Sequence, residues 1–185
     1  MNDSICVKNI FVGGSTNLTD ERERIHSAVH SINDENFKKV PPHKSYMMYN
    51  SYNTFIQRDQ KTYNEFIEKN TDYCIFIFKD KTGNKSIEEL NIAIEKYRND
   101  KQKQFTIAVY VYKDKEVVIG KKISRLLKKI EGYYITYTDN NDLTSHITTT
   151  IRDYSQVSSS KIQAENIAEL HNNNALFFIA NNQTN

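Results

Sequence analysis

One segment constrains the fold of this chain more than any other: residues 73–78 read YCIFIF, an unbroken apolar run. A strand with one solvated face alternates apolar and polar residues, whereas a strand covered on both faces does not. The run is too short to be a typical helix and is rich in aromatic and β-branched residues. It therefore predicts an interior strand of a parallel sheet that has helices on both faces.

Four further strand-like segments occur in the chain, at residues 5–12, 44–49, 105–112 and 133–137. They alternate with segments in which apolar residues recur every three or four positions, the spacing of one helical face. These helical segments lie within residues 16–33, in the second half of 49–70, and at 87–98, 120–130 and 143–154. Five alternations indicate an α/β, flavodoxin-like, doubly wound five-stranded parallel sheet of order 2-1-3-4-5, with helices on both faces.

In that order the second strand lies on one side of the first, and the third, fourth and fifth strands lie on its other side. The boundary between the first and third strands is the switch point of the sheet. Ligands of such sheets bind there, outside the carboxyl ends of the strands. The loops expected to meet at this point span residues 13–19 and 79–86. Any chemistry is therefore expected in the cleft between these two loops.

The bulk properties predict one domain over residues 1–155, then a linker and a C-terminal tail or short helix over 156–185. The serines at 158–160 suggest the linker, and the apolar patch at 175–180 needs a covering surface. A formal net charge of +2 argues against nucleic acid, and no apolar run reaches the roughly 18 residues of a membrane span. With no signal peptide, two cysteines in apolar runs and no ligand spacing among five histidines, we expect a cytoplasmic protein without a metal.

Ser86 and Glu89 form the pattern S-x-x-E, which has two interpretations. The first is a capping box, in which Glu89 accepts a hydrogen bond from the backbone N–H of Ser86. The second is a carboxylate that faces the switch-point cleft and stabilises positive charge on a sugar ring. Spacing alone favours the capping box. Helical phase does not separate Glu89 from its neighbour Glu88, because both lie near the border of the apolar face.

Other candidate residues surround the same cleft. The glycines and serine that follow the first strand could form an anion cradle from backbone N–H groups, or simply a turn. The arginines at the start of the next helix could pair with phosphate or lie in solvent. The aromatic loop after the second strand could stack on a planar base, or could be an ordinary surface loop. These candidates for binding a substrate are Gly13, Gly14, Ser15, Arg22, Arg24, Tyr49, Tyr52 and Phe55, together with Ser86.

Two segments resemble the TIR-like domain family. FVGGSTNLTDERERI resembles its first strand and loop, whose usual form is FVSST followed by a Glu-Arg pair that opens a helix; here the pair is Glu21-Arg22. The segment 60–97 resembles the central part, where a helix leads into a strand, then a turn with Gly and Ser or Thr, then a glutamate followed four residues later by Ala. The matching residues are Asp72, Gly83, Ser86, Glu89 and Ala93.

The resemblance implies that Glu89 is catalytic and acts on an N-glycosidic bond. It implies a NAD glycohydrolase or ADP-ribosyl cyclase with NAD as substrate and no cofactor, an effector of bacterial antiphage defence. Such enzymes are activated by self-association, which implies a homo-oligomer and a sensor domain or partner protein. A non-catalytic oligomerisation or nucleotide-sensing module is the alternative. Nucleoside deoxyribosyl transfer is weaker, because the turn KDKTGNKS lacks the Asp-x-Gly-Thr pattern of those enzymes.

Overall fold

The computed structural model describes residues 7–15, 17–38, 45–50, 59–79, 82–102, 104–113, 121–129 and 134–159. Its five strands are all parallel and lie in the order β2-β1-β3-β4-β5. They are β1 (Val7–Gly14), β2 (Ser45–Asn50), β3 (Tyr73–Phe78), β4 (Thr106–Tyr112) and β5 (Ile135–Tyr137). The helices are α1 (Thr19–Phe37), α2 (Gln60–Asn70), α3 (Asn84–Asn99), α4 (Lys121–Lys128) and α5 (Asn140–Ser159). The α/β class with a parallel sheet, predicted from the sequence, is confirmed.

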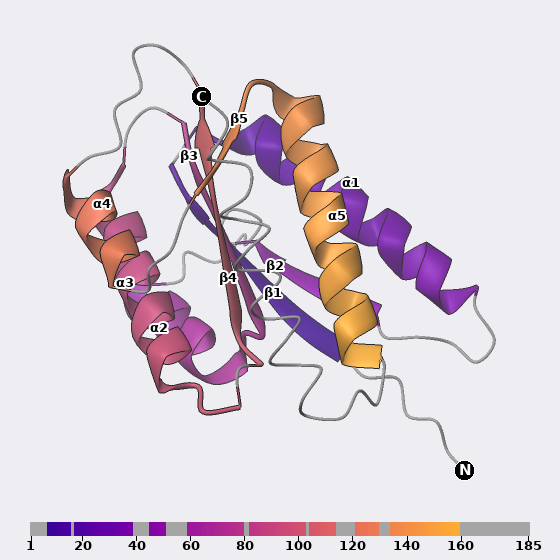
Figure 1. Ribbon diagram of the computed structural model, residues 1–185, viewed down its shortest axis with the longest axis horizontal. Coiled ribbons are helices and arrows are strands. Elements are labelled where there is room, and N and C mark those ends of the chain that lie inside the picture. Colours follow the sequence, from indigo (N-terminus) through magenta and orange to yellow (C-terminus); the bar gives the residue numbers. More distant parts are fainter. Residues whose placement is uncertain are drawn as a thin grey trace.

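The helices form one layer on each side of the sheet (Figure 1). Helices α1 and α5 cover one face, and α2, α3 and α4 cover the other. All six residues of β3 are buried, as the YCIFIF run predicted. Because side chains alternate along a strand, Ile75 and Ile77 join the core under α1 and α5, whereas Cys74 and Phe76 join the core under the other three helices.

The two strands at the switch point are β1 and β3, which are direct neighbours. Helix α1 leaves β1 toward one face of the sheet, and α3 leaves β3 toward the other. The backbone N–H of Ser15 donates to the carbonyl of Ile77, which extends the pairing of β1 and β3 past the end of β1. The first turns of α1 and α3 therefore lie beside the carboxyl ends of the same two strands.

Several helix boundaries differ from the sequence prediction, and α1, for example, continues through Phe37, beyond the predicted range 16–33. Helix α3 begins at Asn84, three residues before the predicted start at 87, so Ser86 lies inside its first turn. Helix α5 continues through Ser159, so two of the three serines assigned to a linker are helical. The segment 160–185, with the apolar patch at 175–180, lies outside the described residues. Of the helices in the described ranges, none has the length and apolarity needed to cross a bilayer.

Lys96 fixes α2 against α3. Its ammonium group donates to the carbonyls of Ile67 (2.8 Å) and Thr71 at the C-terminal end of α2. It also lies 4.5 Å from the centre of the Phe105 ring, and burial lowers its pKa. The last carbonyls of a helix have no partner within the helix, so a lysine there satisfies them. The C-terminal end of α2 is thereby held against α3.

Lys96→Met is expected to lower the free energy of unfolding by about 2 kcal/mol, because buried carbonyls lose a charged donor. Lys69→Met is the matched control: Lys69 is exposed on α2, and its ammonium lies 4.0 Å from the Glu65 carboxylate. Exposed pairs of this kind contribute less than about 1 kcal/mol. Urea denaturation of the two variants measures the difference. Equal midpoints would show that Lys96 does not secure α2.

Candidate active site

Glu89 is a buried carboxylate on α3. Only 7% of its surface is exposed, whereas its neighbour Glu88 is exposed. It lies on the buried side of the helix together with Ser86, Leu90 and Ala93. The tertiary structure therefore separates the two glutamates that helical phase left equivalent. A buried acid near the carboxyl ends of the central strands is a typical feature of an active site in an open α/β sheet.

The capping-box interpretation of Ser86 and Glu89 is wrong. The N-cap of α3 is Gly83, and no side chain caps the helix. Ser86 instead donates its hydroxyl hydrogen to the carbonyl oxygen of Gly14, which joins α3 to the end of β1. Oε1 of Glu89 accepts a hydrogen bond of 3.0 Å from Nε2 of Gln60, the first residue of α2. Because α3 starts earlier than predicted, neither side chain is placed to cap it.

Burial and two neighbouring side chains dominate the charge state of Glu89. Burial is the largest effect and raises its pKa above the usual glutamate value. The hydrogen bond from Gln60 and the positive charge of Arg22 act in the opposite direction, because both stabilise the carboxylate. Glu89 is thus a desolvated acid whose ionised form is stabilised by Arg22 of α1 and Gln60 of α2. Such a group can stabilise positive charge that develops on a substrate.

Arg22 is buried, with 4% of its surface exposed, and comes from the first turn of α1. Its Nη2 donates to the carbonyl of Ser15 at 3.3 Å. Of the two alternatives for the arginines of this helix, a solvent-exposed position is therefore wrong for Arg22. It is correct for Arg24, which is exposed and whose Nη1 donates to Oδ1 of Asn141 at 2.8 Å. The structure brings Arg22, and not Arg24, to the same site as Glu89.

The glycine-serine segment is part of the sheet. Gly13 and Gly14 are the last residues of β1 and pair with β3, and the N–H of Ser15 is bonded to Ile77. The Ser15 N–H is therefore not available for the predicted anion cradle. The hydroxyl of Ser15 is also buried and accepts a hydrogen bond from the backbone N–H of Lys79. Direct contact of Gly13, Gly14 or Ser15 with a substrate stays a prediction.

A partly buried ion pair, which the sequence did not indicate, borders this segment. The carboxylate of Glu21 is 1% exposed and lies 2.8 Å from the ammonium of Lys79, which follows β3. The same ammonium lies 5.6 Å from the centre of the Tyr112 ring, and its bond to Glu21 raises the pKa of Lys79. Glu21 thus joins the first turn of α1 to the end of β3. Because Arg22 lies in the same turn of α1 as Glu21, the pair also holds the backbone of Arg22 near the end of β3.

The predicted aromatic wall lies largely outside the described residues. Tyr49 is within β2, where its backbone pairs with Phe11 of β1. Tyr52 and Phe55 fall in the segment 51–58, which is not described. Tyr63, at the end of the same predicted loop, is in α2 and is packed against the core. No group of three or more potential metal-ligating His, Cys, Asp or Glu side chains is present among the described residues.

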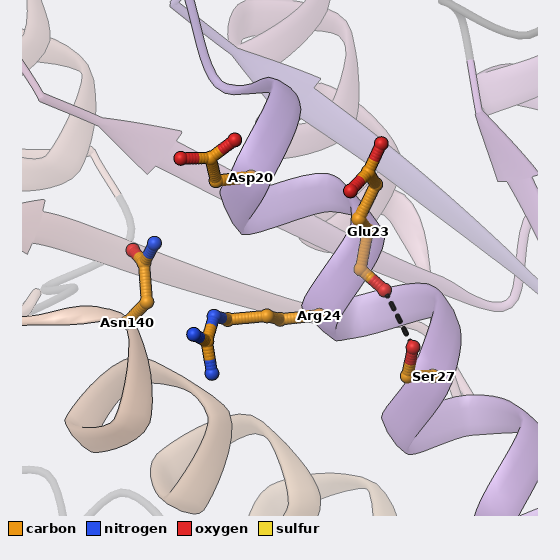
Figure 2. Close-up of a pocket in the computed structure, with 5 residues that line it drawn as sticks. All are labelled: Asp20, Glu23, Arg24, Ser27 and Asn140. Atoms are coloured by element: carbon orange, nitrogen blue, oxygen red, sulfur yellow. Dashed lines mark hydrogen bonds between the residues drawn. The ribbon is translucent and has the colours of Figure 1, made fainter.

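A shallow polar hollow lies elsewhere, between the first turns of α1 and the start of α5 (Figure 2). Arg24 extends across it toward Asn140, and the hydroxyl of Ser27 donates to the carbonyl of Glu23. Glu23 and Arg24, which line it, are exposed. The hollow belongs to the helix layer on the opposite face of the sheet from α3, and Glu89 does not line it. An exposed polar depression without a buried reactive group is a poorer candidate for chemistry than the surroundings of Glu89.

Gln60 is the main site residue that sequence reasoning missed. Asp59 caps α2 by accepting hydrogen bonds of 2.8 Å from both the backbone N–H and the hydroxyl of Thr62. An Asp followed three residues later by Thr was a possible signal for the helix start, and hence for a Gln in the first turn. No local pattern indicated that this turn would lie against α3.

No protein-family model matches this chain, and no curated protein sequence matches it. Some solved structures resemble it at low sequence identity. The CMP N-glycosidase BcmB from Clostridium botulinum has a TM-score of 0.48 and 16% identity, covering 77% of this chain and 99% of its own. Oxidised flavodoxin 1 from Bacillus cereus has a TM-score of 0.44 and 10% identity, covering 84% of this chain and 99% of its own. Likenesses of this size decide neither a family nor an activity.

Proposed function

We propose that this chain is a TIR-like enzyme that cleaves an N-glycosidic bond, with Glu89 as its catalytic carboxylate. The observation that carries the proposal is the environment of Glu89: it is buried at the switch point, bonded to Gln60 and faced by the charge of Arg22. The sequence resemblance to TIR-like domains points to the same residue. Glutamates with this combination of burial and charge partners are candidates for catalysis.

The chemistry assigned to Glu89 is charge stabilisation. When the bond between a sugar and its base breaks, the electron pair leaves with the base nitrogen and the anomeric carbon becomes positively charged. An ionised carboxylate beside that carbon lowers the energy of the transition state. In hydrolysis, a water oxygen then bonds to the anomeric carbon and its proton goes to solvent. In cyclisation, an atom of the substrate itself takes the place of water.

NAD is the favoured substrate, because the TIR-like segments favour it over deoxynucleosides. Nicotinamide is a good leaving group in NAD, since its ring nitrogen is positively charged before the bond breaks. In this proposal Arg22 contributes positive charge near the substrate phosphates or ribose, and Tyr49, Tyr52 or Phe55 stacks on the base. The active form is a homo-oligomer, assembled by a sensor domain or partner in the setting of antiphage defence.

The test is base release by the purified full chain, at high protein concentration and with a crowding agent to favour assembly. NAD, CMP and 2′-deoxynucleosides are supplied separately, and free base and cyclic products are measured by chromatography. Release of nicotinamide from NAD that is lost in Glu89→Gln is the expected result. Base exchange between deoxynucleosides would instead identify the transferase alternative. A chain that assembles but releases no base from any of these substrates would be a non-catalytic module.

A further inference from the structure

A chain of hydrogen bonds connects the two neighbouring glutamates of α3 through the first turns of α2. Nε2 of Gln60 donates to Oε1 of Glu89 and to Oδ1 of Asn64, each at 3.0 Å. Nδ2 of Asn64 donates to Oε1 of Glu88 at 2.6 Å. This series of hydrogen bonds thus begins at the exposed carboxylate of Glu88 and ends at the buried carboxylate of Glu89. Gln60 and Asn64 are one helical turn apart, which places their side chains side by side.

The two carboxylates, which can only accept, determine which group donates in each hydrogen bond of this series. The Glu88 carboxylate offers only acceptors, so it holds the NH₂ group of Asn64 toward itself. The carbonyl of Asn64 must then face Gln60, where it can only accept. Gln60 therefore turns its own NH₂ group inward, with one hydrogen for Asn64 and the other for Glu89. If either amide were reversed, two acceptors would face each other.

We propose that Glu88, Asn64 and Gln60 form an amide relay that fixes Gln60 as a donor to Glu89 and so orients the catalytic carboxylate. Gln60 and Asn64 are positioning residues, and Glu88 is the anchor of the relay on the surface. The catalytic meaning of the relay rests on the function proposed above. Its effect on Glu89 is a property of the folded chain and can be measured without turnover.

The relay is one of several influences on Glu89, and a change at Asn64 leaves the charges of the other groups unaltered. Arg22 acts from α1, and Lys85 and Glu88 act from α3. Burial and the charge of Glu89 raise the pKa of the Cys74 thiol on β3. Asn64 is uncharged and bonds to Gln60 and Glu88, so Asn64→Ala removes the relay without changing any charge at the site. A shift in the titration of Glu89 in this variant would thus report the orientation of Gln60.

The test is an NMR titration of the chain labelled with ¹³C at glutamate carboxyl groups, in which Glu89→Gln identifies the Glu89 signal. We expect the midpoint for Glu89 to lie at higher pH in Asn64→Ala than in the wild type, and higher still in Gln60→Met, which has no donor at all. Asn70→Ala, the same change at the far end of α2, should titrate like the wild type. Urea denaturation checks that each variant is folded.

Kinetics give a second readout under the conditions found for base release. Asn64→Ala should lower kcat about tenfold and leave KM nearly unchanged. The pH below which kcat falls should also be higher in this variant than in the wild type. A Glu89 midpoint that is the same in Asn64→Ala and the wild type would overturn the relay, even if Gln60→Met shifted it. If the titrations follow the expected order but Glu89→Gln retains full turnover, the relay stands and the proposed function fails.

Discussion

A Glu89→Gln variant should lose base release by about a thousandfold and yet unfold at a higher temperature than the wild type at neutral pH. The loss follows from the proposed role, because an amide carries no charge with which to stabilise a positive anomeric carbon. The gain in stability follows from burial. The substituted amide would keep an oxygen that accepts from Gln60, but the position would no longer carry a desolvated negative charge.

The pH dependence of stability makes this prediction sharper. Burial raises the pKa of Glu89 in the folded state above its value in the unfolded chain. Between these two pKa values the folded state binds more protons, so the wild type loses stability as the pH rises through that window. Glu89→Gln has no such loss. The unfolding temperatures should therefore converge at acid pH and differ at neutral pH, where each 1 kcal/mol corresponds to about 2–4 °C for a chain of this size.

Glu95→Gln is the matched control, since it makes the same change on the same helix at a half-exposed position. Glu95 pairs with Arg98 and Lys129 on the surface, at 3.4 and 3.3 Å. This variant should keep its turnover and change the free energy of unfolding by less than about 1 kcal/mol. Calorimetry over a series of pH values, combined with the base-release assay, measures both effects. A Glu89→Gln variant that is less stable than the wild type at neutral pH would mean that the ionised carboxylate stabilises the fold.

Gly14→Ala is expected to be the most destabilising single substitution near the site, at about 4 kcal/mol. Gly14 has a φ of +135°, a conformation that L side chains rarely adopt. A Cβ added there would also lie 2.0 Å from the carbonyl oxygen of Ile77. That oxygen belongs to the backbone of β3, so relief requires the two central strands to move apart. The movement would also displace the Gly14 carbonyl from Ser86 on α3.

Gly83→Ala provides the comparison at a glycine that has room. A Cβ at this N-cap position of α3 would meet no atom within 4 Å, and its φ of −72° suits any residue. The expected cost is below about 1 kcal/mol, the usual range for such a change at an N-cap. Thermal and urea unfolding of both variants measures the contrast. Similar midpoints for the two would show that the strand ends tolerate a side chain, and that Gly14 is not required for the geometry of the switch point.

The sequence by itself predicted the class of the fold, because that depends on local patterns. The unbroken apolar run of β3 is the direct consequence of being covered on both faces, and its bounds were predicted without error. Helical periodicity located all five helices, because each helix buries one face against the sheet and repeats its apolar residues every three or four positions. The boundary of α3 was misplaced because Gly83 caps it without a side-chain signal, and that error left the capping-box interpretation open. Glu89 was singled out, but spacing alone could not separate it from Glu88.

The tertiary structure decided what surrounds Glu89. Helices α1, α2 and α3 are distant in the sequence, and each contributes one group to the site: Arg22, Gln60 and Glu89. Packing of α2 against α3 buries Glu89, leaves Glu88 exposed, and supplies an amide donor that no local pattern indicated. Local periodicity reports which side of a helix is buried. Which polar groups meet there depends on contacts between helices, and those contacts form only when the whole sheet brings the helices together.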